Sequence, residues 1–341
     1  MNPEATCVCV TGLYALSMTR LLIVSALAVV ILGCQDKQSA QKPASALAQT
    51  GSSLPTPERF AGQFSSFDEY WHQNKAELTR YNLRQSRYGD THEGEAVLVF
   101  VAEDFLPKPQ VKQEQGDSDD ALSVLKLNAY RRFYTGIYPY TVMTSSFTPA
   151  AGTPTLKLSS TVQEWCGQVY SQVNRRQDGL HTLMHSYFQN EADRETLLPN
   201  AALEDGVWAK IRIDPTSIEV GPREIVPALD YIRMRHKALR PYPAVVSRMD
   251  GATTELVGHP VTALRINYPP LGRELVIYYE PAFPHIIQAW EETEGPSRTT
   301  AVRTHAIMDD YWNHNSAEDG AYRDALGLEH SARRASISLR R

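Results

Sequence analysis

The chain has 341 residues, of which 42% are hydrophobic and 21% are charged, and its formal net charge is −5. This is an ordinary globular composition, and a chain of this length can form one large domain or two smaller ones. The slightly acidic balance argues against a broad basic surface, so we expect no nucleic-acid partner.

An apolar run without charges, LLIVSALAVVIL, occupies residues 21–32 and follows Arg20. It is too short for a membrane span, which needs about 20 residues, and it has the length of the apolar part of a secretory signal. The stretch before it contains Glu4 and no basic residue ahead of Arg20, so Met18 is a more natural start for translation. The sequence therefore predicts a signal peptide over residues 1–33.

The apolar run ends in Ile31-Leu32-Gly33-Cys34, which resembles the lipobox of bacterial lipoproteins. The resemblance implies that the Cys34 thiol receives a diacylglyceryl group, that the chain is cut between Gly33 and Cys34, and that the new amine is then acylated with a fatty acid such as palmitate. Several acyl chains anchor a protein stably, because each buried methylene adds about 0.8 kcal/mol. In this family Asp after the Cys favours the inner membrane. Here Gln35 follows, so we expect an outer-membrane lipoprotein with its domain in the periplasm.

Composition divides the rest of the chain into three parts. Residues 34–60 are rich in Gln, Ser, Ala and Pro and have no periodic apolar face, which predicts a flexible tether after the lipidated Cys34. Residues 61–326 are expected to form a single β-rich globular domain. Residues 327–341 are rich in Arg and lack a core pattern, which predicts a disordered tail.

The domain opens with a short helix and then becomes mainly β. Ser66-Phe67-Asp68-Glu69 is a capping box that predicts a helix over residues 67–76. Alternating or β-branched runs separated by Gly, Pro and Asp predict strands. These runs cover residues 78–88, 95–104, 124–136, 138–149, 155–176, 180–188, 242–250, 254–268, 273–280, 285–294 and 299–310.

Two segments in the middle have helical spacing instead. Residues 201–213 place apolar side chains on one helical face, and residues 223–236 do the same, with Pro227 tolerated in a first turn. A last helix is expected within residues 316–329. The sequence thus predicts an α+β, β-rich fold: a curved, half-barrel-like antiparallel sheet with two central helices and a short N-terminal helix.

Common catalytic motifs are missing, and the one thiol after the leader is ambiguous. The chain has no G-x-S-x-G elbow, no phosphate loop, no opening G-x-G-x-x-G and no H-E-x-x-H. Cys166 could be a nucleophile with His181 or His185 as base, or a buried structural Cys on a strand. We favour the structural role, which leaves no catalytic residue and no cofactor.

Two groups of histidines raise the question of a metal. His181 and His185 share one face of a strand but lie about 13 Å apart, too far for one ion. His305, Asp309, Asp310 and His314 form a second mixed cluster at a strand end. We expect no metal at either place.

Aromatic residues recur on the predicted strands. They can fill the core of a sheet packed on helices, or some can line a groove for a lipid, a glycan or a peptide. The candidates for a groove are Tyr134, Tyr138, Tyr140, Trp165, Tyr187, Tyr278 and Trp290.

Two resemblances bear on function. Residues 203–292, with strands, central helices and a meander, are similar in layout to the Lol-type lipoprotein carriers, whose curved sheet can hold acyl chains. "TGIYPYTVMTSSFTP" followed by "SSTVQEWCGQVY" resembles a family of bacterial envelope lipoproteins, some of which carry the name septum formation inhibitor Maf. The Ser-x-Ser-x-Arg-Arg stretch of the Maf pyrophosphatases is missing, so no catalytic residue carries over.

These observations predict a non-enzymatic outer-membrane lipoprotein that touches the membrane through Cys34 and binds a lipid, a glycan or an envelope protein. Two alternatives stay open. The first is a periplasmic hydrolase or transferase that uses Cys166, and the second is a scaffold in envelope assembly or cell division.

Overall fold

The computed structural model describes residues 64–116, 118–191 and 193–329. The predicted leader, the lipidation site at Cys34, the whole predicted tether and most of the predicted tail lie outside these residues. Sixteen strands form one sheet, in the order β10-β11-β12-β13-β14-β15-β16-β1-β2-β4-β5-β6-β7-β8-β9, with β3 paired to β2. All neighbours are antiparallel except the parallel pair β10 and β11.

The strand bounds follow most of the predicted runs, and long neighbouring hairpins give the sheet its extent. The strands are β1 (Ala76–Arg87), β2 (Asp90–Leu106), β3 (Val111–Lys112), β4 (Leu122–Thr135), β5 (Tyr138–Pro149), β6 (Lys157–Glu164), β7 (Gly167–Arg176), β8 (Gly179–Ser186), β9 (Arg194–Leu198), β10 (Ala202–Leu203), β11 (Gly221–Val226), β12 (Tyr242–Thr254), β13 (Val257–Tyr268), β14 (Arg273–Tyr279), β15 (Ile287–Glu294) and β16 (Ser297–Asp309).

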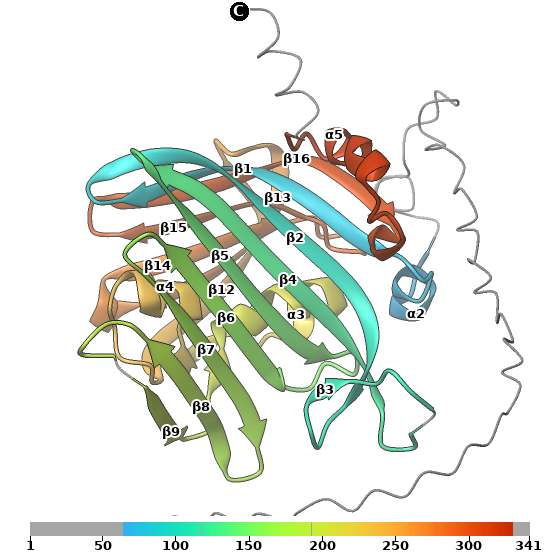
Figure 1. Cartoon of the computed structure of the whole chain (residues 1–341), viewed down its shortest axis with the longest axis horizontal. Helices are drawn as coiled ribbons and strands as arrows, with labels where there is room; N and C mark the ends of the chain where they lie inside the picture. The colour runs from blue at the N-terminus through green and yellow to red at the C-terminus, as the bar shows by residue number, and fades with distance from the viewer. Residues whose placement is uncertain (1–63, 117, 192, 330–341) are drawn as a thin grey trace, which may run out of the picture. The chain divides into compact units, whose positions relative to one another are not determined.

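Short helices occupy the hollow and the ends of the sheet. The sheet curves around α3 (Val207–Ile213) and α4 (Leu229–Met234), as Figure 1 shows. At the N-terminal side is α2 (Phe67–Trp71), whose Glu69 N–H donates to Ser66 Oγ. This confirms the predicted cap, although the helix ends earlier than expected. The C-terminal turns are η6 (Ala317–Ala321) and α5 (Tyr322–Ala325). The fold is therefore the predicted β-rich curved sheet with few helices.

Three boundaries differ from the predictions. Residues 223–226 belong to β11 and pair with β12, so only the second half of the predicted helix over residues 223–236 is helical. Residues 155–176 are two strands joined by a tight turn at Trp165 and Cys166. Leu328 is 8% exposed and packs with Leu326 against the outer face of the sheet, so the predicted tail does not begin at residue 327.

The hollow of the sheet is filled by side chains. Its core joins the inward faces of the strands to Val207, Trp208 and Ile211 of α3 and to Ile232 of α4. Alternation explains the inward face: in β4 Leu125, Leu127 and Phe133 are buried, while the residues between them are more exposed.

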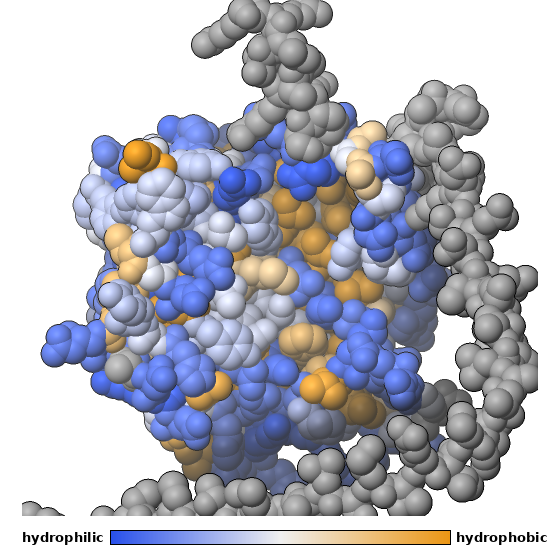
Figure 2. All heavy atoms as spheres, in the orientation of Figure 1, coloured by the Kyte–Doolittle hydropathy of each residue, from blue (hydrophilic) through white to orange (hydrophobic). Residues whose placement is uncertain are grey.

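The outer face carries smaller apolar clusters of its own. One of them joins Leu78, Val97 and Ile307 to Leu326 and Leu328, and Figure 2 shows an apolar patch beside α5 on an otherwise largely polar surface. Burial of this patch fixes the last described turns on the sheet.

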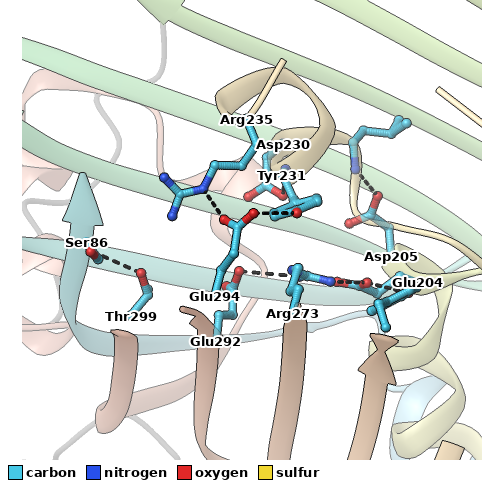
Figure 3. Close-up of polar contacts among 12 residues, drawn as sticks. Ser86, Glu204, Asp205, Asp230, Tyr231, Arg235, Arg273, Glu292, Glu294 and Thr299 are labelled. Atoms are coloured by element: carbon cyan, nitrogen blue, oxygen red, sulfur yellow. Dashed lines mark hydrogen bonds and ion pairs between the residues drawn. The ribbon is translucent and has the colours of Figure 1, made fainter. Parts of the chain in front are cut away.

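Charged groups inside the hollow tie the helices to the sheet. The Arg273 guanidinium donates to both carboxylate oxygens of Glu204, at 2.6 and 2.7 Å (Figure 3). Tyr268 donates to the same carboxylate at 2.6 Å. Arg131 of β4 pairs with Glu292 at 2.9 Å. On the far side of α3, Arg212 donates to Glu77 through two nitrogens. Each of these buried charges has an opposite partner, as burial requires.

Asp205, in the turn just before α3, is a buried carboxyl that contacts the start of α4. The Asp205 carboxylate accepts from the N–H of Leu229, the first residue of α4, at 2.9 Å. Asp230 lies beside it and pairs with Arg131 at 3.4 Å. Burial, with the Asp230 charge second, raises the pKa of Asp205 to about 8. Asp205 therefore caps α4 and carries a proton below that pH.

Candidate functional site: an aromatic rim and an outer groove

Large apolar side chains are exposed at one end of the sheet, where successive hairpins turn. They are Tyr88 after β1, Ile137 between β4 and β5, Trp165 between β6 and β7, and Tyr187 after β8, with exposed fractions from 62% to 80%. Because β1, β2, β4, β5, β6, β7 and β8 are neighbours in this order, these tips follow one another along a single edge. This row of exposed apolar side chains makes the end of the sheet a candidate interaction surface.

Four aromatic residues at this end of the sheet are linked by contacts. The Tyr88 and Tyr140 hydroxyls are 2.7 Å apart, the rings of Tyr138 and Tyr140 are 5.9 Å apart, and Tyr138 stacks on Trp165 at 6.2 Å. We call Tyr88, Tyr138, Tyr140, Trp165 and Tyr187 the aromatic rim. Offset ring pairs at these distances add about 0.5–1.5 kcal/mol each, so the exposed rings are held in place.

Beside the rim, the outer face of β5, β6, β7 and β8 is hollowed into a groove of about 850 Å³, which we call the outer groove. Trp165 and Tyr187 line it together with Cys166 and Gly167. Its polar lining is made of hydroxyl, amide, imidazole and carboxylate groups from Thr141, Thr161, Gln163, Glu164, Gln168, Tyr170, His185, Ser186 and Asp193. The groove thus offers ring faces and hydrogen-bonding groups side by side.

The turn that carries Trp165 is anchored from inside the sheet. The Glu164 carboxylate is buried, pairs with Arg233 of α4 at 3.4 Å and accepts the N–H of Cys166 at 2.5 Å. The Arg233 guanidinium in turn lies 4.0 Å from the centre of the Phe188 ring. Arg233 of α4 therefore contacts both the turn that carries Trp165 and Phe188, the residue after Tyr187.

A glycine makes room for the second ring. A Cβ added at Gly167 would lie 3.0 Å from Cδ1 of Tyr187 and 3.3 Å from its Cβ. Tyr187 thus packs directly against the backbone at the start of β7, and a larger residue there would displace it.

Cys166 is exposed on the β6–β7 turn, so the prediction of a buried strand Cys is wrong. A hydrogen bond to Glu164, with the negative charge of that carboxylate second, raises the pKa of the Cys166 thiol. A nucleophilic Cys needs the opposite shift, because the thiolate is the reactive form. The turn thus stabilises the thiol of Cys166, and its surroundings do not activate it.

The two histidines of β8 lie on a strand, as expected, and each has its own acidic partner. His181 contacts Asp178 at 2.8 Å and His185 contacts Asp193 at 3.2 Å. They are separate surface pairs, and His185 alone lines the outer groove.

The second mixed cluster is explained by hydrogen bonds. Ligand atoms of Asp309, Asp310 and His314 lie within 4.8 Å of one another, whereas His305 is not part of this group. His314 Nδ1 forms a hydrogen bond with Asp309 at 2.8 Å, and Asn313 donates to Asp310 at 2.7 Å. The positive charge of Lys75 also stabilises the ionised forms of Asp309 and Asp310. These partners account for the arrangement, and we assign no metal to it.

The seven predicted groove residues do not line one groove. Tyr138, Tyr140, Trp165 and Tyr187 come together at the rim, although Tyr140 is only 1% exposed. Trp290 is buried between Tyr81 and Trp208, with ring centres at 4.8 and 5.1 Å. The remaining two lie apart on the outer face, Tyr134 half-exposed beside Arg132 and Tyr278 against Val276.

The prediction missed Tyr88 and the polar lining of the outer groove. Tyr88 has a left-handed φ of 56° directly before Gly89. An aromatic residue followed by Gly between two predicted strands is a usable signal for an exposed turn. The lining residues come from four strands, and their meeting depends on the register of the sheet.

No protein-family model and no curated protein matches this chain. Among solved structures, it is similar to a β-barrel-like protein from Brucella abortus, of the domain of unknown function DUF1849. That match has 10% identity and a TM-score of 0.43, and it covers 69% of this chain and 98% of that one. Over the described ranges, no helix has both the length and the apolar character needed to cross a bilayer.

Proposed function

We propose that this protein is a lipid-anchored, non-enzymatic binding protein of the bacterial envelope, and that its outer groove binds a linear, largely uncharged glycan. The observation that carries the glycan assignment is the pairing of two exposed rings, Trp165 and Tyr187, with a groove floor of hydroxyls and amides. The anchor rests on the lipobox at Cys34.

The chemistry of a sugar matches this lining. A pyranose ring has one face of C–H groups, which packs on an aromatic ring, and an edge of hydroxyls, which exchange hydrogen bonds with amides and hydroxyls. Two carboxylates line the groove and both are paired, Asp193 with His185 and Glu164 with Arg233. The groove therefore favours a ligand without a strong charge of its own.

The space around the central charges is too small for a lipid chain. Among the described residues, the cavities beside the central charges are about 20 Å³ at Trp208 and Trp290 and about 30 Å³ at Arg273 and Glu292. Sites for drug-sized ligands measure about 300–1,000 Å³, so neither cavity fits an acyl chain. The outer groove falls within that range.

Titration of the full chain with N-acetylglucosamine and glucose oligomers, followed by calorimetry, tests the glycan assignment. Trp165→Ala should weaken binding by about 2 kcal/mol, or roughly 30-fold, as expected for a central aromatic anchor. Trp312→Ala is the matched control, since Trp312 is exposed at 38% and lies outside the groove. Equal binding by the wild type and Trp165→Ala, or no binding to any oligomer, would refute it.

The anchor is tested separately. Cells given a clickable fatty acid should label the protein, and Cys34→Ala should abolish the label. Label that persists in Cys34→Ala would disprove lipidation at this residue, whatever the result for the groove.

A further inference from the structure

A second hollow lies on the inward face of the sheet near its β9 edge. It has a volume of about 620 Å³ and lies between β8, β9 and residues 236–239, which follow α4. We call it the edge groove. Its lining is Thr182, Met184, Phe188, Gln189, Asn190, Glu191, Arg194, Thr196, His236, Lys237, Ala238 and Leu239. The inward position distinguishes it from the outer groove, and the short loop after β8 separates the two.

The floor of the edge groove is an exposed part of the main core. Met184 belongs to that core, and Phe188 and Leu239 pack against it while staying partly exposed. A ligand with an apolar portion would cover this floor and gain about 25 cal/mol for each Å² that it removes from water.

Two cations line the edge groove without acidic partners. Arg194 donates one hydrogen bond, to the carbonyl of Asn190 at 2.8 Å, which leaves most of its donors for a ligand. Within residues 64–329 as described, no carboxylate forms an ion pair with Arg194 or Lys237. The neighbouring cations have acidic partners: Arg233 pairs with Glu164, and Arg235 pairs with Glu294.

The one carboxylate in the lining is satisfied. Glu191 accepts from the Ser186 hydroxyl at 3.0 Å and pairs with Nδ1 of His236. It does not compete for Arg194 or Lys237, so the free charge of the edge groove is positive. Positive charge beside an apolar floor selects a ligand with both an anionic group and a hydrocarbon part.

We propose that the edge groove binds an anionic amphiphile, a molecule with a carboxylate or phosphate head and a short hydrocarbon chain. The head lies against Arg194 and Lys237, and the chain lies on Met184, Phe188 and Leu239. This site is independent of the outer groove, since no residue lines both.

The test uses the full chain with Cys34→Ser, produced without export so that no lipid is attached and no detergent is needed. Dodecyl phosphate, dodecanoate, dodecanol and inorganic phosphate are titrated separately by calorimetry, below the micelle concentration. Both anionic amphiphiles should bind at least tenfold more tightly than dodecanol and than phosphate, and a difference between them identifies the preferred head. Lys237→Ala and Arg194→Ala should each weaken them about tenfold, as for a lost charged hydrogen bond.

Two controls separate the site from general effects. Arg240→Ala removes a nearby cation that stacks on Tyr242 and does not line the groove, so it should leave binding unchanged. Leu239→Ser should weaken dodecyl phosphate and dodecanol by the same factor. Unchanged thermal midpoints show that the variants are folded. Each of three results would overturn the proposal. Dodecanol could bind as tightly as dodecyl phosphate, inorganic phosphate could bind as tightly as dodecyl phosphate, or Lys237→Ala could bind dodecyl phosphate as tightly as the wild type does. Trp165→Ala should have no effect here.

Discussion

The buried carboxylates between α3 and α4 predict that stability falls as pH rises through neutrality. Four acids, Glu204, Asp205, Asp230 and Glu292, surround two cations, Arg131 and Arg273. All four cannot be ionised without an excess of buried negative charge. Burial raises the pKa of both Asp205 and Asp230, and that of Asp205 reaches about 8, so Asp205 keeps its proton at neutral pH.

The sign of the effect follows from proton counting. The folded state binds the proton of Asp205 up to about pH 8, whereas an unfolded Asp releases it near pH 4. The folded state therefore holds more protons between these values, and the free energy of unfolding falls with rising pH. For this single group, integration from pH 6 to pH 9 gives a loss of about 2–3 kcal/mol.

Asp205→Asn isolates this contribution. The amide oxygen of Asn can still accept the N–H of Leu229, so the cap of α4 is kept while the titration is removed. Urea unfolding followed by circular dichroism at pH 6, 7, 8 and 9 should give a falling curve for the wild type and a nearly flat one for Asp205→Asn. Asp104→Asn, an exposed carboxyl on β2, is the matched control and should keep the wild-type slope. A flat wild-type curve, or the same slope in Asp205→Asn, would refute the reasoning.

Three further predictions follow from contacts described above. Arg212→Ala leaves the Glu77 carboxylate buried without its partner and should lower the free energy of unfolding by about 3–5 kcal/mol in urea titrations. Arg265→Ala breaks an exposed pair and should lower it by less than about 1 kcal/mol. Equal losses in the two variants would contradict the burial of the Arg212–Glu77 pair. Gly167→Ala should displace Tyr187 and weaken oligosaccharide binding severalfold in calorimetry while the thermal midpoint changes little, whereas Gly258→Ala, in open space, should change neither. In the native protein Cys166 should react with iodoacetamide at pH 7 more slowly than free cysteine does, because the Glu164 carboxylate raises the pKa of the thiol. Glu164→Gln should speed the reaction. A reaction faster than that of free cysteine would indicate an activated thiol and contradict the prediction.

Local patterns predicted the elements well where one physical signal dominated. The Ser66–Glu69 cap and the alternation in β4 and β5 correspond to the structure, because a side-chain cap and a half-buried strand leave their marks within a few residues. The pattern of residues 223–226 predicts a helix wrongly, since apolar spacing over a short run fits both the helical and the strand period. Their pairing with β12 decides the outcome, and that contact is distant in sequence.

The candidate site was predictable in part. Tyr138, Tyr140, Trp165 and Tyr187 were selected as aromatic residues on or near strands, and the structure brings them to one end. Trp290 was selected on the same ground and is buried, because the face on which a side chain falls depends on register. The edge groove had no signal in the sequence, since Arg194 and Lys237 meet only through the fold.

The placement of rings on successive hairpin tips gives the aromatic rim a built-in period. Tyr88, Tyr138 and Trp165 belong to the β1–β2, β4–β5 and β6–β7 hairpins, which lie next to one another in the sheet. Neighbouring tips are two strand spacings apart, about 9–10 Å, but the side chains lean together, so that the Tyr138 and Trp165 rings lie 6.2 Å apart. A polymer whose repeat matches the spacing of the rings would meet a ring at successive steps, and its affinity would rise with each added repeat. A polymer with another repeat would engage one ring well and gain little from further length, so the lengths of the side chains and the spacing of the strands would together select the ligand.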